Sequence, residues 1–276
     1  MQLTEQSYFS PQVARELMSA SQVKRFLECE ALALAEIRGD FRREESTALL
    51  VGGYVDAFFS RTLADYTIAH PQIYTNKGTL RSDFAQAEDI IAMIQGDPLL
   101  MHMISGETQK IVTGEIAGVP FRGKLDSLLS AEQCHEIAAL YPEMAEDLMM
   151  ADGAIVDLKC MRSTEAVWVP GAGRMSFVEA WKYPLQLGIY QRLLGNKLPC
   201  YLVVVTKERV PEKMLIKVPD YMMESALESV SELIPKFNDM KLNPETATRC
   251  EKCDYCRKTK ILTGAVYADE LDGVTL

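Results

Sequence analysis

The chain has 276 residues, a mass of 30.9 kDa, a formal net charge of −10 and a sequence pI of about 5.0. Hydrophobic residues make up 48%, which supports a packed core, and no unbroken apolar run reaches the ~18 residues of a membrane span. Nucleic-acid-binding proteins usually carry a basic surface. The net negative charge of this chain therefore excludes DNA binding that is driven by overall charge. A local basic patch or bound metal ions would be required.

The polar first ten residues lack the basic start and apolar core of a signal peptide. We therefore expect a cytoplasmic protein without a membrane segment. In a reducing compartment its seven cysteines would be thiols or metal ligands rather than disulfides.

The first hundred residues are predicted to be helical. Apolar spacing favours helices over 10–37, 46–66 and 82–95. The second of these contains Gly52 and Gly53, and each glycine within a helix costs about 1 kcal/mol relative to alanine. Such a pair suggests that another backbone or a ligand approaches closely there.

The middle of the chain changes to strand periodicity. Two strands are expected over 109–116 and 119–129, joined by a tight turn at 117–118, which together indicate a hairpin. An acidic helical insertion over 131–150 and a short strand over 154–160 follow.

The last third resumes with a predicted helix over 176–194. The continuous apolar run 200–206 is typical of a strand buried on both faces. A more exposed strand (212–218) and an amphipathic helix (220–239) come next. The order of elements predicts an α/β fold with a central mixed sheet flanked by helices. We expect one domain over 1–276, with an N-terminal helical part and a C-terminal cysteine-rich tail.

Charged residues within strand 154–160 are the main functional signal. Side chains alternate between faces along a strand, so Ile155, Asp157 and Lys159 share one face while the other face is apolar. Unpaired buried charge is costly, so this acid and lysine need partners or a metal. Asp126 supplies a second acid from the preceding strand. If the two strands are neighbours, the carboxylates can converge, and paired carboxylates are common ligands of Mg²⁺.

These residues carry a family resemblance. Asp126 followed by Asp157–Lys159 resembles the D…(D/E)-x-K signature of the PD-(D/E)XK nuclease superfamily. Gln186 and Tyr190, four apart on one helix face, resemble the Q-x-x-x-Y motif of its RecB-like branch. The order of motifs over about 122–194 is most similar to RecE-type phage and prophage exonucleases.

The resemblance implies a restriction-endonuclease-like core and a Mg²⁺-dependent (or Mn²⁺-dependent) exodeoxyribonuclease acting on linear duplex DNA in phage recombination. A single-strand annealing recombinase and a homo-oligomer are the implied partners. RecB-like members usually carry a metal-binding histidine on an early helix; Asp56 occupies that place here. The implied catalytic residues are Asp126, Asp157, Lys159, Gln186 and Tyr190, and the implied metal ligands are Asp56, Asp126, Asp157 and the carbonyl of Leu158.

Structural alternatives exist for each of these residues. Asp157 and Lys159 would also suit a salt bridge on an edge strand, Gln186 and Tyr190 a polar helix face, and Asp56 a surface acid. Two other functions remain open. One is a non-catalytic protein that binds nucleic acid or a recombinase on the same fold with a structural metal, and the other is a nuclease acting on RNA or in a toxin pathway.

A second motif lies in the tail. Cys250, Cys253 and Cys256 form C-x₂-C-x₂-C, a spacing that suits zinc or an iron–sulfur cluster. Cys29 is the candidate fourth ligand. The layout resembles RecB-like nucleases such as the AddB helicase–nuclease subunit and certain CRISPR-associated nucleases, which pair one early cysteine with three late ones around a [4Fe–4S] cluster. The resemblance favours the cluster over zinc, and unmetallated thiols are the alternative.

Overall fold

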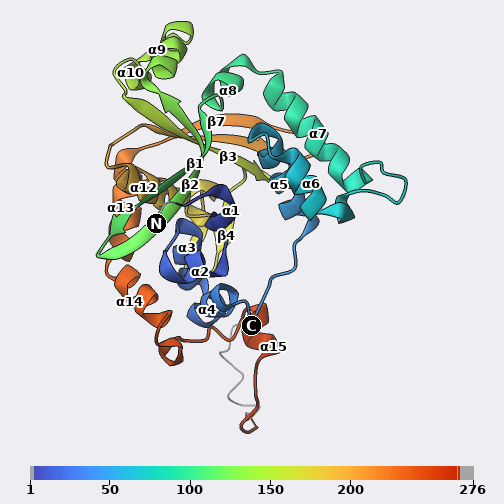
Figure 1. Cartoon of the computed structure of the whole chain (residues 1–276), viewed down its shortest axis with the longest axis vertical. Coiled ribbons are helices and arrows are strands. Elements are labelled where there is room, and N and C mark those ends of the chain that lie inside the picture. Colours follow the sequence, from blue (N-terminus) through green and yellow to red (C-terminus); the bar gives the residue numbers. More distant parts are fainter. Residues whose placement is uncertain (1–2, 266, 268–276) are drawn as a thin grey trace.

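A five-stranded mixed sheet forms the centre of the molecule (Figure 1). The computed structural model describes residues 3–265 and 267. The strand order is β1–β2–β3–β6–β7, and every neighbouring pair is antiparallel except β3 and β6, which run parallel. The strands are β1 (Glu107–Ile116), β2 (Val119–Ser130), β3 (Gly153–Met161), β6 (Cys200–Thr206) and β7 (Lys213–Val218). The predicted central mixed sheet is therefore confirmed.

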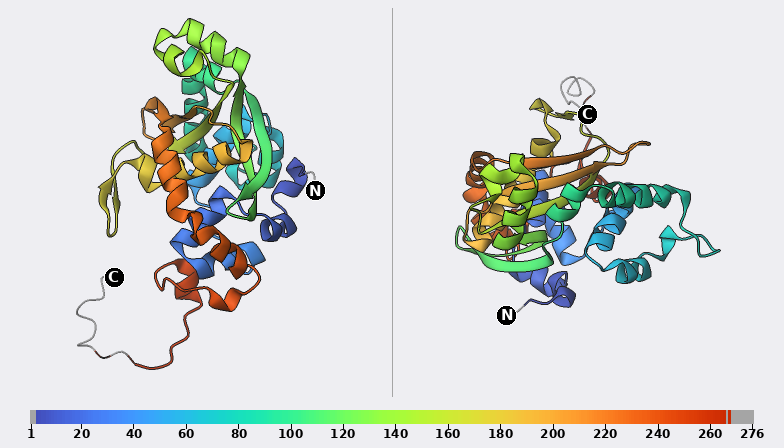
Figure 2. Two further views of the ribbon diagram at one scale, coloured as in Figure 1. Left: turned by 90° about the vertical axis from the view of Figure 1, so that its left-hand side faces the viewer. Right: turned by 90° about the horizontal axis from the view of Figure 1, so that it is seen from above.

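Helices lie on both sides of this sheet (Figure 2). The elements before β1 are α1 (Glu5–Tyr8), α2 (Pro11–Glu16), α3 (Ala20–Glu28), α4 (Glu30–Arg38), α5 (Thr47–Phe59), α6 (Leu63–Ala69), η1 (Pro71–Ile73), α7 (Ser82–Gln95) and α8 (Pro98–Met103). Those after β2 are α9 (Ala131–Leu140), η2 (Pro142–Met144), α10 (Ala145–Leu148), α11 (Phe177–Ala180), α12 (Tyr183–Leu194), α13 (Asp220–Ser231), α14 (Leu233–Met240), η3 (Pro244–Thr246) and α15 (Asp254–Lys258).

Each face of the sheet has its own hydrophobic core. On β6, Val204 belongs to the cluster formed with α3, α12, α13 and α14, whereas its neighbour Val203 belongs to the cluster formed with α5, α7 and α9. On β3, Ile155 and Val156 divide in the same way. All side chains of β6 are buried, as expected for a strand covered on both faces.

The N-terminal helical region is broken where the sequence predicts one continuous stretch. Met18 leaves the helix and pairs with the sheet instead: its N–H donates to Pro120 O over 2.9 Å, and its carbonyl accepts from Arg122 N over 2.8 Å. Ser19 then caps α3 through Gln22 N. Apolar spacing persists across the break, and periodicity therefore could not reveal it.

The segment between β3 and α12 also differs from expectation. It contains a small hairpin of β4 (Val167–Val169) and β5 (Gly173–Met175), which no sequence pattern indicated. The predicted helix over 176–194 is interrupted at Lys182, whose φ of 54° places it in the left-handed region. Pro184 in the first turn of α12 is well suited to a helix start, so α12 begins at Tyr183.

The nearest neighbours of the glycine pair of α5 are side chains, not the backbone or ligand that the sequence suggested. A Cβ atom on Gly53 would lie 2.7 Å from the Tyr66 hydroxyl, so a tyrosine of α6 packs against α5 at this point. On Gly52 a Cβ atom would come no nearer than 3.8 Å to Cys160, which is an ordinary contact.

Candidate active site

The end of the β2–β3 ladder brings the two predicted acids together. Main-chain pairing runs from Ser130–Gly153 to Ser127–Val156, and the next residues along the two strands are Asp126 and Asp157. Beyond this point the Asp126 carboxylate continues the connection, because Oδ2 accepts a hydrogen bond from Leu158 N over 2.9 Å. The two strands are neighbours, as the sequence argument required.

Lys159 lies between the two carboxylates. Its Nζ forms an ion pair with Asp157 Oδ2 and a second one, at 3.8 Å, with Asp126 Oδ2. Burial alone would lower the pKa of Lys159, but the charges of Asp157 and Asp126 outweigh burial and raise it. The side chain is therefore an ammonium group held at the meeting point of the two strands.

Asp157 is held in place by a hydrogen bond from helix α12. Its side chain is almost fully buried, at 1% exposure, and Oδ1 accepts a hydrogen bond from Gln186 Nε2 over 2.9 Å. The same Gln186 amide nitrogen lies 3.2 Å from the Tyr190 hydroxyl. Asp157 Oδ2 faces the Lys159 ammonium group and has no further hydrogen-bond partner among the described residues. This oxygen therefore already has a positively charged neighbour.

Tyr190 fits beside β2 because the strand has a glycine there. A Cβ atom on Gly123 would lie 3.0 Å from the Tyr190 ring and 3.1 Å from a Val112 methyl group. Burial, followed by the charges of Asp157 and Asp126, raises the pKa of Tyr190 well above its usual value. Its hydroxyl therefore keeps its proton and can act as a hydrogen-bond donor.

A lysine that the sequence did not single out completes this network. Lys24 on α3 donates to Gln186 Oε1 over 2.8 Å and lies 5.2 Å from the centre of the Tyr183 ring. Burial, and then the charge of Lys159, lowers the pKa of Lys24 to about 7. In the sequence, Lys24 is marked only by its position beside the apolar face of a helix. Its contact with Gln186, 162 positions away, could not be predicted from that.

Asp56 comes from α5, on the other side of the sheet from α12, and its side chain lies near Asp126. Together with Asp126 and Leu158 it lines a cavity of about 10 Å³, about the space of one water or one ion. Burial, and then the charge of Asp157, raises the pKa of Asp126 well above its usual value. Burial likewise raises the pKa of Asp56. The pKa values indicate crowded negative charge that a cation would relieve.

The oxygen donors here are of the kind that binds a divalent cation. Asp56, Asp126 and Leu158 line one cavity, and Asp157, which does not line it, is joined to Asp126 through the Lys159 ammonium group. Mg²⁺ takes oxygen ligands and usually few of them from the protein, keeping several waters. The carbonyl oxygen of Leu158 accepts a hydrogen bond from Lys159 Nζ over 3.3 Å. The arrangement can therefore hold a metal ion with an ammonium group beside it.

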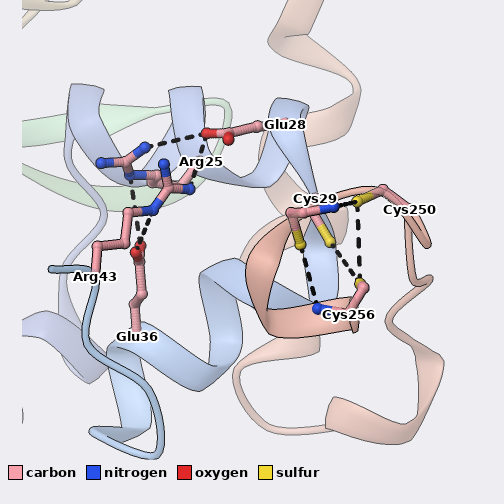
Figure 3. A network of polar contacts seen from close by, with 8 residues as sticks. Arg25, Glu28, Cys29, Glu36, Arg43, Cys250 and Cys256 are labelled. Carbon is pink, nitrogen blue, oxygen red and sulfur yellow. Dashed lines mark hydrogen bonds and ion pairs between the residues drawn. The ribbon is translucent and has the colours of Figure 1, made fainter. Parts of the chain in front are cut away.

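The four predicted cysteines also come together, at the junction of α3 and α4. Their sulfur atoms all lie within 4.8 Å of one another, which makes them a group that could hold a metal ion. Figure 3 shows Cys29 from the helix junction facing Cys250 and Cys256 from the tail. Burial opposes ionisation of Cys250, but N–H donors from Lys252 and Cys253 lower its pKa to about 7.

The fold and the site define a protein of the PD-(D/E)XK nuclease class: one acid on β2, D-x-K on the neighbouring strand, and Q-x-x-x-Y on the helix that packs against both. The sequence model of the family described as "PDDEXK-like domain of unknown function (DUF3799)" matches residues 19–136 and 143–259, and the chain belongs to this family.

A solved structure supports the same assignment. The crystal structure of a protein from Eubacterium rectale, described as a "putative exonuclease", is 34% identical, covers 99% of each chain and superposes with a TM-score of 0.86. No protein with a curated description matches the chain. Within residues 3–265 no helix is both long and apolar enough to cross a membrane.

Proposed function

We propose that this protein is a Mg²⁺-dependent exodeoxyribonuclease that hydrolyses phosphodiester bonds of linear duplex DNA. One observation carries the proposal: a half-buried lysine contacts acids from two separate strands, and a glutamine from the facing helix holds one of those acids. A salt bridge on an edge strand, the structural alternative, does not account for this, because β3 lies in the middle of the sheet.

The metal would be held by Asp56, Asp126, Asp157 and the Leu158 carbonyl. A bound Mg²⁺ supplies a Lewis acid for the phosphate and lowers the pKa of a coordinated water. Lys159 orients the attacking water and balances the negative charge that develops on the phosphate. The water oxygen forms a bond to phosphorus, the bond from phosphorus to the leaving sugar oxygen breaks, and that oxygen takes a proton.

The helix residues have a positioning role in this proposal. Gln186 fixes the Asp157 carboxylate through Nε2, and Lys24 fixes Gln186 through Oε1. With Lys24 as donor, the amide can present only its nitrogen to Asp157. The Tyr190 hydroxyl is available to steady the scissile strand.

The family resemblance supplies the substrate and the setting of the proposal. The motif order most similar to RecE-type exonucleases and the "exonuclease" in the description of the Eubacterium rectale protein both favour DNA ends and a role in phage or prophage recombination in the cytoplasm. A single-strand annealing recombinase and a homo-oligomer are the partners proposed on this basis. We propose further that residues 1–276 act as one nuclease domain, and that the cysteines bind a structural iron–sulfur cluster or zinc.

The test compares nucleotide release from linear and covalently closed circular duplex DNA, with Mg²⁺, Mn²⁺ or EDTA present. Release from linear DNA alone, dependent on the metal, is expected. Asp157→Asn should reduce it by about 10²- to 10³-fold, the range for losing a transition-state electrostatic contact. Asp152→Asn, an exposed acid just before β3, is the matched control and should remain active.

The outcomes separate the alternatives. Equal cleavage of circular DNA would reject the exonuclease assignment, and release from RNA alone would indicate an RNA nuclease. A folded wild type without any release under Mg²⁺ or Mn²⁺ would favour the non-catalytic binding protein.

A further inference from the structure

The cysteine group has a geometry that distinguishes between a single ion and a cluster. Cys29 Sγ and Cys256 Sγ are 3.6 Å apart, and Cys250 Sγ and Cys256 Sγ are 3.9 Å apart. A tetrahedral zinc ion with Zn–S bonds of about 2.3 Å separates its sulfurs by about 3.8 Å. A [4Fe–4S] cluster binds each sulfur through a different iron, which holds the sulfurs farther apart.

We propose that Cys29, Cys250, Cys253 and Cys256 bind one tetrahedral zinc ion that fastens the C-terminal segment to the α3–α4 junction. This inference deepens the structural metal proposed above and replaces the iron–sulfur cluster that the family resemblance favours.

Main-chain donors around the sulfurs support bound thiolates. Cys250 Sγ accepts from Cys253 N over 3.3 Å and from Lys252 N over 3.5 Å, and Cys253 Sγ accepts from Cys256 N over 3.4 Å. Hydrogen bonds from N–H groups favour the ionised form of an acid, which is the form that binds zinc. Two close turns of the tail therefore present two sulfurs, those of Cys250 and Cys253, that already accept hydrogen bonds from main-chain N–H groups.

The hydrophobic core at this place is too small to hold the tail alone. Among the described residues, the local cluster has three buried members, Cys29, Leu32 and Cys256, with Phe41 and Tyr255 packed at its edge. Small units with little buried apolar surface usually depend on a disulfide or a metal. The metal proposed here would supply what burial does not.

The position of Cys29 connects this clamp to the active site. Cys29 is the single residue between α3 and α4. It is the C-cap of α3 and the N-cap of α4, and its backbone is extended. Lys24, which contacts Gln186, lies on the same helix α3. Beside the junction, Arg25 and Arg43 form ion pairs with Glu28 and Glu36 (Figure 3). A metal at Cys29 would therefore restrain the helix that carries Lys24.

The primary experiment is metal analysis of the full-length wild type, prepared with and without oxygen from medium containing both iron and zinc. One zinc per chain, no acid-labile sulfide and no absorption near about 400 nm are expected. Four irons with sulfide in the anaerobic preparation, or no bound metal at all, would overturn the proposal. Replacement of zinc by Co²⁺ should give the intense visible bands of a tetrahedral thiolate site, and weak octahedral bands would contradict it.

A variant pair assigns the ligands. The zinc content per chain should be at least about tenfold lower in Cys253→Ser than in wild type. Cys134→Ser changes a buried cysteine outside the group and should keep one zinc per chain. Zinc retained in Cys253→Ser would reject the ligand set. The wild-type metal content decides the proposal even if Cys253→Ser fails to fold.

Hydrogen exchange tests the clamp itself. Removing the metal by chelation should increase amide exchange in α3, α4 and residues 248–259, while β3 and β6 stay protected. Unchanged exchange in these helices would reject the clamp. Metal analysis and hydrogen exchange do not measure nuclease activity. The zinc proposal can therefore fail while the proposed nuclease function holds, and the reverse.

Discussion

The side chain of Asp126 accepts a hydrogen bond from the main chain of Leu158, across the point where two paired strands cease to pair. A carboxylate thus takes the place of a backbone carbonyl in the ladder. Leu158 follows Asp157 and precedes Lys159, so this one contact fixes the position of the second acid relative to both. A change at Asp126 should therefore affect stability as well as activity.

Replacement of Asp126 by asparagine should abolish activity. The same replacement should increase the stability of the metal-free protein. Asparagine keeps an acceptor for Leu158 N and removes the repulsion from Asp157 and Asp56 that contributes to the raised pKa of Asp126. Thermal unfolding in EDTA at about pH 8 should show a melting temperature a few degrees above that of wild type. Mg²⁺ should raise the melting temperature of wild type alone, because only wild type binds it.

The same comparison has a defined pH dependence. Because the pKa of Asp126 is higher in the folded protein than in the unfolded chain, the folded state holds more protons between the two values. Stability of the metal-free wild type should therefore fall as pH rises from about 4, the unfolded value, through the raised folded value. The advantage of Asp126→Asn should grow as the pH rises above about 4. A constant difference would show that repulsion at Asp126 is not the cause.

Substitution of Asp56 by asparagine tests the third acid. If Asp56 contributes to metal binding, the Mg²⁺ concentration for half-maximal activity should rise at least about tenfold, a typical loss for a residue that supports a metal. Asp65→Asn removes an exposed acid from α6 and should leave the Mg²⁺ titration unchanged. Overlapping titrations for wild type and Asp56→Asn would assign Asp56 a structural role.

Lys24→Met tests the support of Gln186. Methionine keeps much of the side-chain length but removes the donor to Gln186 Oε1, so Asp157 loses a fixed partner. We expect kcat to fall about tenfold, equivalent to about 1.4 kcal/mol, with little change in KM for DNA. Lys182→Met, an exposed neighbour of α12, is the control.

A double-mutant cycle separates positioning from DNA contact. If Lys24 acts through Gln186, the effects of Lys24→Met and Gln186→Ala should not add, because the two residues share one interaction. A change confined to KM, or fully additive losses, would instead indicate that Lys24 contacts DNA independently.

Gly123→Ala should disturb Tyr190. The new methyl group would meet the Tyr190 ring at 3.0 Å and Val112 at 3.1 Å, and overpacking in a core costs about 1–3 kcal/mol. Urea unfolding should show this loss. Gly264→Ala, where a Cβ atom meets nothing within 4 Å, should be neutral. An equally stable Gly123→Ala protein would mean that the ring moves freely.

The strands were predicted well because their signals are local. Alternation placed Asp157 and Lys159 on one face of β3, where they form an ion pair. The apolar run of β6 indicated a strand covered on both sides, and all its residues are buried. The helices were predicted in kind but not in extent. Breaks at Met18 and Lys182 arise from contacts with β2 and from a left-handed residue before Pro184, and neither changes the apolar spacing.

The sequence by itself determined the class of fold and the residues most suited to chemistry, because periodicity and motif spacing depend on near neighbours along the chain. Tertiary structure decided which of these residues meet. Asp126 reaches Lys159 only because strand pairing stops one residue earlier, Lys24 reaches Gln186 across 162 positions, and Cys29 reaches Cys256 across 227. Such contacts depend on how the sheet and helices pack in three dimensions, and local preference carries no record of that packing.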